Sequence, residues 1–367
     1  MPGFTAPKLL WLRRHEPDIF AHTAKVLLPK DYVRLCMTAD HATDVSDASG
    51  TLWLDVGKRA WSDEMLAACG LGQNHMPSLH EGCELTGQLR QTVASAWGMR
   101  PVPVAAGGGD NAAGAIGCGA VRNGDAFLSL GTSGVLFVVN DAFSPAPAQG
   151  AHAFCHALPE RWHQMAVLLA AGASLQWIAD IIGAENADAA LSQAQQGGGP
   201  FSGGEIFLPY LSGERTPHND PKATGVLFGL THDSDRGALV RAVLEGVAFA
   251  FADGLAVLED AGQVIDRLTL IGGGGRSAYW AGILANVLGK PLACGEEGHA
   301  GPAFGAARLA RIAVTGSAVE DVATPPELEN LVLPDPALRA RALEKYARFQ
   351  ALYPALKASF ASAGGLA

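Results

Sequence analysis

The sequence predicts an α/β protein with two similar halves, and three stretches carry this prediction. In the stretch 102–117, a short apolar segment runs through three glycines into a small-residue segment of helical composition. The stretch 268–280 repeats this order of strand, glycines and helix. In 126–139, two runs of β-branched and aromatic residues flank a short glycine turn, as in a hairpin. A repeated strand–glycine–helix pattern is what two α/β domains facing each other would give.

Length, charge and cysteine usage narrow the class of protein. The 367 residues predict two to three domains, and 49% hydrophobic content suffices for sizeable cores. A net charge of −10 argues against binding to nucleic acid or to an anionic membrane. The six cysteines form no Cys-x-x-Cys pair, and the sequence has neither a secretory leader nor an uninterrupted membrane-spanning run. We therefore expect a cytoplasmic protein.

Residues 1–122 are expected to form the first domain. Asp44 and Asp47 lie in a run that alternates Asp with Ser, which is typical of helix caps and turns. By composition these two carboxylates could also ligate a metal. Local patterns predict the other elements in order: a helix from Ala6 to about His15, two helices near 63–69 and 87–97, and a strand at 102–105.

One carboxylate, Asp110, directly follows the glycines at 107–109. Glycines let the backbone turn sharply there and let a ligand approach closely. The junction therefore presents one acid at a strand end, beside a helix N-terminus. The stretch also fits the loose Gly-x-Gly-x-x-Ala dinucleotide pattern. An ordinary strand-to-helix turn with a capping aspartate is an equally good interpretation.

The turn of the predicted hairpin, 131–134, offers backbone N–H groups and two hydroxyls and little else. Small residues allow several N–H donors to converge on a phosphate oxygen. Taken alone, the turn also fits a plain hairpin tip. An acid at a strand end followed at once by such a hairpin is much less common by chance.

Residues 123–367 are expected to form the second domain. Histidines 152, 156 and 163 are interleaved with apolar residues, but their spacing matches no zinc pattern and we predict no metal site. Glu214 and Arg215 lie in an irregular segment and form either a structural salt bridge or part of a cleft. Local patterns predict strands at 152–157 and 162–165, a core helix at 236–261, and a last helix from 336 to Tyr353, before a proline.

Together these motifs resemble those of the FGGY carbohydrate kinases over nearly the whole chain. The resemblance implies two ribonuclease-H-like domains of the actin/hexokinase ATPase type around a cleft, with the first incomplete. It also implies ATP-dependent phosphorylation of a sugar with Mg²⁺, and it is strongest to members that convert D-xylulose to D-xylulose 5-phosphate. The motifs that carry it are 3–12, 107–111, 130–134, 211–218, 225–230 with 242–245, and 272–277.

The resemblance implies roles for individual residues. Asp110 would be the base that accepts the sugar hydroxyl's proton, with Asn111 and Gly109 contacting the sugar. The flat backbone of 272–275 would let a base or ribose lie against it, although a bare structural turn competes. We expect a side chain at position 274 to stand where the nucleotide lies. The residues implied for ATP are Gly131, Thr132, Ser133, Gly225, Gly273, Gly274 and Arg276.

Two features depart from the family. Ala238 stands where a polar residue is usual, and the Asp-x-Gly-Thr phosphate loop that opens the family's sequences is not among the 367 residues. We therefore expect the strand at 102–105, apolar on both faces like a central strand, to lack neighbours. Residues 1–122 would then be the labile half of a chain that aggregates, binds ATP weakly and phosphorylates nothing.

Three alternatives remain open. The chain could be a kinase for ribulose, gluconate or glycerol, or a non-catalytic remnant that keeps the nucleotide loop at 272–277. A Rossmann-type dehydrogenase rests only on the Gly-x-Gly-x-x-Ala pattern, and the hairpin argues against it. The expected partners are a small sugar and ATP, with no nucleic acid and no membrane, and a homodimer is left open.

Overall fold

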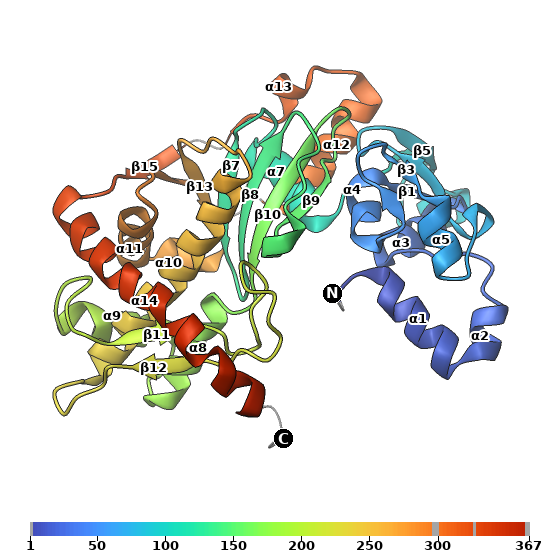
Figure 1. Cartoon of the computed structure of the whole chain (residues 1–367). Helices are drawn as coiled ribbons and strands as arrows, with labels where there is room; N and C mark the ends of the chain where they lie inside the picture. Colours follow the sequence, from blue (N-terminus) through green and yellow to red (C-terminus); the bar gives the residue numbers. More distant parts are fainter. Residues whose placement is uncertain (1–2, 296–300, 326–327, 364–367) are drawn as a thin grey trace.

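In the computed structural model, which describes residues 3–295, 301–325 and 328–363, a seven-stranded sheet organises the larger part of the molecule (Figure 1). β7 and β8 form the expected hairpin, and β9 and β10 are the strands expected after it. β13 pairs parallel with β7 and β14, while the other neighbours are antiparallel. The strand order is β15 (Leu328–Val332), β14 (Leu292–Gly295), β13 (Leu268–Ile271), β7 (Ala126–Leu130), β8 (Gly134–Asn140), β10 (Trp162–Leu168) and β9 (His152–Cys155).

Helices cover both faces of this sheet because alternate side chains of a strand point to opposite sides. Leu128 and Leu136 belong to the main core with α10 (Arg236–Asp260), the core helix expected from the sequence. Phe127 and Phe137, whose rings stack at 4.7 Å, pack on the other face against α7 (Asp110–Cys118). α7 in turn packs against α12 (Pro302–Thr315).

Close packing explains the small residues of α7. A Cβ atom on Gly305 of α12 would lie 1.7 Å from the backbone oxygen of Ala113. The two helix backbones therefore touch where both sequences lack side-chain bulk. The small-residue segment after Asp110 serves this helix contact.

The remaining helices and a short hairpin surround α10. α14 continues through Pro354, so the helix end predicted at Tyr353 is wrong. Tyr353 and Phe360, on either side of the proline, are both buried in the main core. This packing outweighs the local cost of an interior proline, about 3 kcal/mol. The elements are α8 (Gly172–Ile181), α9 (Ala187–Gln196), β11 (Ile206–Leu208), β12 (Val226–Phe228), α11 (Ala278–Leu288) and α14 (Pro336–Ala363), with the short α13 (Val319–Val322) after α12.

The N-terminal part contains short elements, and its described strands pair only two by two. β6, expected to lack neighbours, pairs with β5 alone among the described strands, and its residues are half-buried or exposed. The strand thus lacks a paired neighbour on one of its two edges within the described residues. The elements are α1 (Thr5–His15), α2 (Pro17–Ala21), α3 (Pro29–Thr38), β1 (Ala42–Asp44), α4 (Val45–Ala48), β2 (Leu54–Asp55), β3 (Ala60–Trp61), α5 (Asp63–Ala68), β4 (Ser78–His80), β5 (Leu85–Gln88), α6 (Gln91–Ala96) and β6 (Pro103–Ala105).

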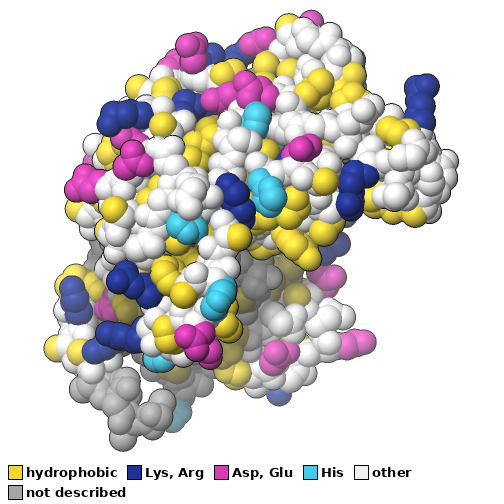
Figure 2. Space-filling model, turned by 90° about the vertical axis from the view of Figure 1, so that its right-hand side faces the viewer, with side chains coloured by type: hydrophobic (Ala, Val, Ile, Leu, Met, Phe, Trp, Pro, Cys, Tyr) yellow, Lys and Arg dark blue, Asp and Glu magenta, His cyan; other side chains and the backbone are white. Residues whose placement is uncertain are grey.

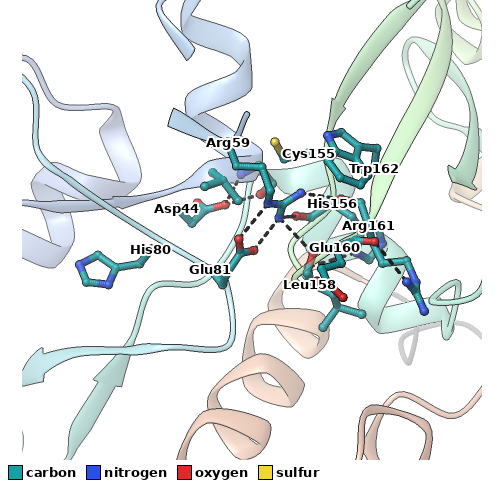
Figure 3. Close-up of polar contacts among 12 residues, drawn as sticks. Asp44, Arg59, His80, Glu81, Cys155, His156, Leu158, Glu160, Arg161 and Trp162 are labelled. Atoms are coloured by element: carbon teal, nitrogen blue, oxygen red, sulfur yellow. Dashed lines mark hydrogen bonds and ion pairs between the residues drawn. The ribbon is translucent and has the colours of Figure 1, made fainter. Parts of the chain in front are cut away.

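Arg59, in the turn between β2 and β3, joins this N-terminal part to the large sheet (Figure 3). Its guanidinium donates to both carboxylate oxygens of Glu81, at 2.8 and 2.5 Å. It also donates to three backbone oxygens of the turn between β9 and β10, those of His156, Leu158 and Arg161. The Arg59 side chain thus connects two segments that lie about a hundred positions apart in the sequence.

The face of the molecule that carries the N-terminal part shows acidic and basic side chains interspersed with apolar ones (Figure 2). Lys and Arg do not gather there into one patch. Across the described ranges, no helix combines the length and the apolar character needed to cross a bilayer.

Candidate active site

Asp110 is the first residue of α7, and Gly109 is its N-cap. The Asp110 side chain is exposed. Its Oδ1 atom accepts hydrogen bonds from the backbone N–H of Asn111 at 2.7 Å and from the Asn111 side chain at 3.0 Å. The structure therefore presents an accessible carboxylate, oriented by its neighbour, at the positive end of a helix dipole.

Beneath the glycine turn, three carboxylates share one ammonium group. Lys30 Nζ lies 2.6 Å from Asp31 Oδ1, 2.9 Å from Asp44 Oδ1 and 3.6 Å from Asp47 Oδ2. Burial alone would lower the pKa of Lys30, but the three carboxylates outweigh it and raise that pKa. For Asp47, burial raises the pKa to about 6 against the opposing effect of Lys30. Lys30 thus supplies the positive charge of this cluster.

This cluster holds the turn that carries Asp110. Asp44 caps α4 by accepting the N–H groups of Ser46 and Asp47, as the cap interpretation expects, and it also accepts the Ser46 hydroxyl. The Ser46 Oγ in turn accepts the Gly109 N–H at 3.0 Å. A Cβ atom on Gly109 would lie 3.4 Å from the Asp47 Cα, so Asp47 lies directly beside the residue that precedes Asp110.

Lys30, Ser46 and Asp47 were not among the predicted site residues. Ser46 and Gly109 are 63 positions apart, and no local spacing predicts their contact. The only available signal was the run of alternating Asp and Ser. The interpretation of this run as a helix cap was correct for Asp44. It did not predict the contacts of Ser46 with Gly109 or of Asp47 with Lys30.

The tip of the β7–β8 hairpin is exposed at Thr132 and Ser133. The turn between β10 and α8 packs against it: the N–H of Gly172 donates to the Gly131 oxygen at 2.8 Å. The N–H groups of Ala171 and Ala173 donate to the Thr132 oxygen at 3.0 and 3.1 Å. These bonds occupy the carbonyl side of the tip and leave its hydroxyl-bearing residues facing outward.

The glycine loop after β13 lies against the base of the same hairpin. Gly272 has φ +91°, and a Cβ there would lie 2.9 Å from the Leu130 backbone. A Cβ on Gly274 would lie 2.5 Å from Leu130 Cγ. The expectation that a side chain at Gly274 would point into a nucleotide site is therefore wrong, because this position faces Leu130. Gly273 is exposed, and a Cβ there would meet only Arg276 Nη2, at 3.7 Å.

The structure thus brings together two of the predicted nucleotide motifs. Leu130 contacts the glycine loop and is followed directly by Gly131 of the hairpin tip. Arg276 is exposed, and its Nε donates to the Gly273 oxygen at 3.2 Å. Gly225 instead precedes β12, where a Cβ would lie 2.7 Å from Leu211 Cδ2. Packing in the β11–β12 region therefore accounts for a glycine at position 225.

Glu214 and Arg215 take different partners. The Glu214 carboxyl is buried, and its Oε1 accepts the backbone N–H groups of Arg215 at 2.7 Å and Leu169 at 3.1 Å. Burial raises the pKa of Glu214 to about 8. The Arg215 guanidinium lies 3.2 Å from His152 Nε2. Neither interpretation offered by the sequence anticipated that Glu214 binds the backbone.

Models of two known domains match the chain. The N-terminal domain of the FGGY family of carbohydrate kinases matches residues 1–117, and the C-terminal domain of that family matches residues 126–314.

Curated relatives match most of the chain. A xylulose kinase of Escherichia coli (strain K12) is 54% identical over 97% of this chain and 74% of its own length. One from Klebsiella pneumoniae is 55% identical over 86% of this chain and 65% of its own length. One from Bacillus subtilis (strain 168) is 36% identical over 84% and 62%. The chain thus spans 62% to 74% of the length of these relatives.

Solved structures match as well. A xyloylose kinase from Brucella ovis has a TM-score of 0.93 and 52% identity, covering 98% of this chain and 74% of that one. A xylulose kinase from Rhodospirillum rubrum has a TM-score of 0.88 and 29% identity, covering 98% and 73%. A gluconate kinase from Lactobacillus acidophilus has a TM-score of 0.92 at 23% identity, a likeness that concerns the fold alone.

Proposed function

The chain belongs to the FGGY family of carbohydrate kinases and has their actin/hexokinase-like ATPase fold, and we propose that it transfers the terminal phosphoryl group of ATP to D-xylulose. The products are D-xylulose 5-phosphate and ADP. The observation that carries the proposal is the exposed Asp110 carboxylate at the start of α7, in a chain 54% identical to a xylulose kinase.

In this proposal Asp110 is the general base. As the terminal sugar oxygen attacks the γ-phosphorus of ATP, its proton passes to the Asp110 carboxylate and ADP leaves. The two hydrogen bonds from Asn111 hold that carboxylate in one orientation, and the Lys30 cluster holds the turn below it. Asn111 and Gly109 would contact the sugar. Transfer of this kind depends on positioning more than on covalent chemistry.

We assign the nucleotide to the larger part of the chain. Thr132 and Ser133, with Gly131, would bind the transferred phosphate at the exposed hairpin tip. Gly273 and Arg276 would line the adenosine side. Gly274 and Gly225 would act by packing, against Leu130 and Leu211, rather than by touching ATP. The domain limits 1–122 for the sugar side and 123–367 for the nucleotide side belong to this proposal.

The carboxylates around Lys30 are not suited to bind Mg²⁺ as a site made of protein ligands alone. Its carboxylates already share the Lys30 ammonium, and no group of three ligating side chains suited to a metal lies within the described ranges. Mg²⁺ is commonly bound through substrate phosphates with one or two carboxylates. We therefore propose that Mg²⁺ arrives with ATP, and we assign it no step. We place the reaction in the cytoplasm, in keeping with six free cysteines.

The test is ADP release with D-xylulose, D-ribulose, D-gluconate and glycerol as acceptors. The sequence alone predicts no turnover, but because Ser46 and Asn111 hold the Asp110 turn we expect turnover with D-xylulose and much less with the others. Faster turnover with another acceptor would replace D-xylulose in the proposal. ADP binding without turnover on any acceptor would instead favour a non-catalytic nucleotide-binding protein.

A further inference from the structure

We infer that Glu214 is a positioning residue for the nucleotide phosphates, because its carboxyl holds the backbone turn that fixes the hairpin tip at 131–133. The inference rests on the proposed function in one respect, the assignment of that tip to phosphate. It gives a role in nucleotide binding to a residue that lies beneath the tip and does not touch the nucleotide.

The first step is the hydrogen bond between Glu214 and the turn that follows β10. The carboxyl is only 2% exposed and comes from the irregular segment that follows β11. Its Oε1 accepts the N–H of Leu169, the residue directly after β10. Next to it, Thr216 accepts the Val167 N–H at 3.1 Å on its hydroxyl and donates its own N–H to the Val167 oxygen at 3.2 Å. The segment thus runs along the edge of β10 up to its last residues.

The second step leads from the turn to the tip. Leu169 opens the turn whose next residues, Ala171 and Gly172, donate N–H groups to the carbonyl oxygens of Thr132 and Gly131. The Leu169 oxygen itself lies 3.4 Å from the Ser133 hydroxyl. Every residue of the tip is therefore hydrogen-bonded to the turn that Glu214 holds.

The third step is that the turn and the hairpin tip pack directly against each other, with no room for an added side chain between them. A Cβ on Gly172 would lie 2.6 Å from the Gly131 oxygen. A Cβ on Gly134, at the other end of the tip, would lie 2.5 Å from the Phe251 ring and 3.2 Å from the Ala171 Cβ. Since the backbones touch directly, a shift of the turn moves the tip.

The ionisation of Glu214 is consistent with a neutral hydrogen-bonding group. Burial raises its pKa to about 8, and the charged groups that act on it are Arg215 and Asp253. Its Oε2 has no hydrogen-bond partner among the described residues. A glutamine keeps the acceptor oxygen and the shape of a protonated carboxyl. Glu214→Gln is therefore the conservative variant, and Glu214→Asp keeps the carboxyl but shortens its reach.

The test compares the binding of a non-hydrolysable ATP analogue by calorimetry in the full chain, at pH 7 and well below each variant's Tm. We expect Glu214→Leu to weaken binding of this analogue by about tenfold or more, the scale for losing a buried hydrogen bond, and Glu214→Gln to restore it. The matched control is Glu205→Leu, which removes another buried carboxylate bound to Ser234 and not to the turn. We expect wild-type affinity from it.

Hydrogen exchange supplies a readout that needs no nucleotide. In Glu214→Asp, we expect faster exchange in peptides that cover 131–134 and 169–173, with exchange in β14 unchanged. Wild-type exchange at the tip in this variant would overturn the inference, as would wild-type affinity of Glu214→Leu for the ATP analogue. Normal binding of the analogue by the wild-type chain without sugar phosphorylation would instead overturn the proposed function and leave the role of Glu214 intact.

Discussion

Two adjacent glycines of the loop after β13 should respond in opposite ways to the same substitution. At Gly274 a new Cβ would lie 2.5 Å from Leu130 Cγ and 2.6 Å from Leu130 Cδ2. At Gly273 the nearest atom is a guanidinium nitrogen of Arg276, at an ordinary contact distance of 3.7 Å. Gly274→Ala therefore tests packing, whereas Gly273→Ala tests the surface that we assign to the nucleotide.

The magnitude follows from the distances at Gly274. Carbon atoms attract best at about 3.5–4.0 Å, so Leu130 or the loop must move by about 1 Å. Overpacking of this kind costs about 1–3 kcal/mol. With an unfolding entropy of about 2.1 cal/mol/K per residue, 1 kcal/mol corresponds to about 1.3 °C in a chain of 367 residues, so Gly274→Ala should lower Tm by about 1–4 °C. Gly273→Ala should leave Tm unchanged or raise it slightly, since alanine restricts the unfolded chain.

Thermal unfolding and ADP calorimetry on both variants provide the assay. We expect Gly273→Val to weaken ADP binding by about tenfold at constant Tm, equivalent to about 1.4 kcal/mol. In the double variant Gly274→Ala with Leu130→Ala, removal of the leucine side chain should relieve part of the strain. The reasoning fails if Gly274→Ala keeps the wild-type Tm and loses ADP affinity, because position 274 would then face the nucleotide.

Three further predictions concern Asp110, Asp47 and the Arg59–Glu81 pair. Asp110→Asn should lower the rate of D-xylulose phosphorylation by about 10²–10⁴ while ADP affinity stays constant, and near-wild-type turnover would rule out Asp110 as the base. Burial raises the pKa of Asp47 to about 6 from 3.8, so the folded state binds a proton that the unfolded chain has released. The free energy of unfolding should therefore fall as pH rises from about 4 to 6, and Asp47→Asn should reduce that slope. A double-mutant cycle of Arg59→Lys and Glu81→Gln should give a coupling of about 0.5–3 kcal/mol in unfolding, whereas additive effects would contradict the structure.

Local patterns predicted the elements that carry the site. The hairpin at β7 and β8, the start of α7 at Asp110 and the glycine loop after β13 all occur where strand and glycine patterns place them. Each is specified within about fifteen residues, by apolar alternation or by glycines that a tight turn requires. The family resemblance, now supported by 54% identity, came from the same short motifs.

Contacts between distant segments account for what the sequence did not predict. The direction of Gly274 depends on Leu130, which belongs to another strand. Ser46 reaches Gly109 through a hydroxyl, a type of contact that leaves no periodic trace. Pro354 was interpreted as a helix end because local rules omit the buried aromatic residues that hold α14 on both sides of it.

The packing of α7 fixes the position of Asp110 relative to the hairpin tip. Asp110 precedes the boundary predicted at 122, yet the helix it begins packs through Ala115 and Cys118 onto Phe127 and Phe137 of the large sheet. The hairpin tip connects these same two strands, β7 and β8. Asp110 and the hairpin tip are thus carried by one packed body, whose close-packed interior has low compressibility. Lys30 and Asp47 lie outside this body, in the N-terminal part, which Arg59 joins to the backbone of the β9–β10 turn. The Ser46–Gly109 hydrogen bond and the packing of α4 against Cys155 of β9 also tie the Lys30–Asp47 cluster to this body, so that the cluster stays beneath Asp110.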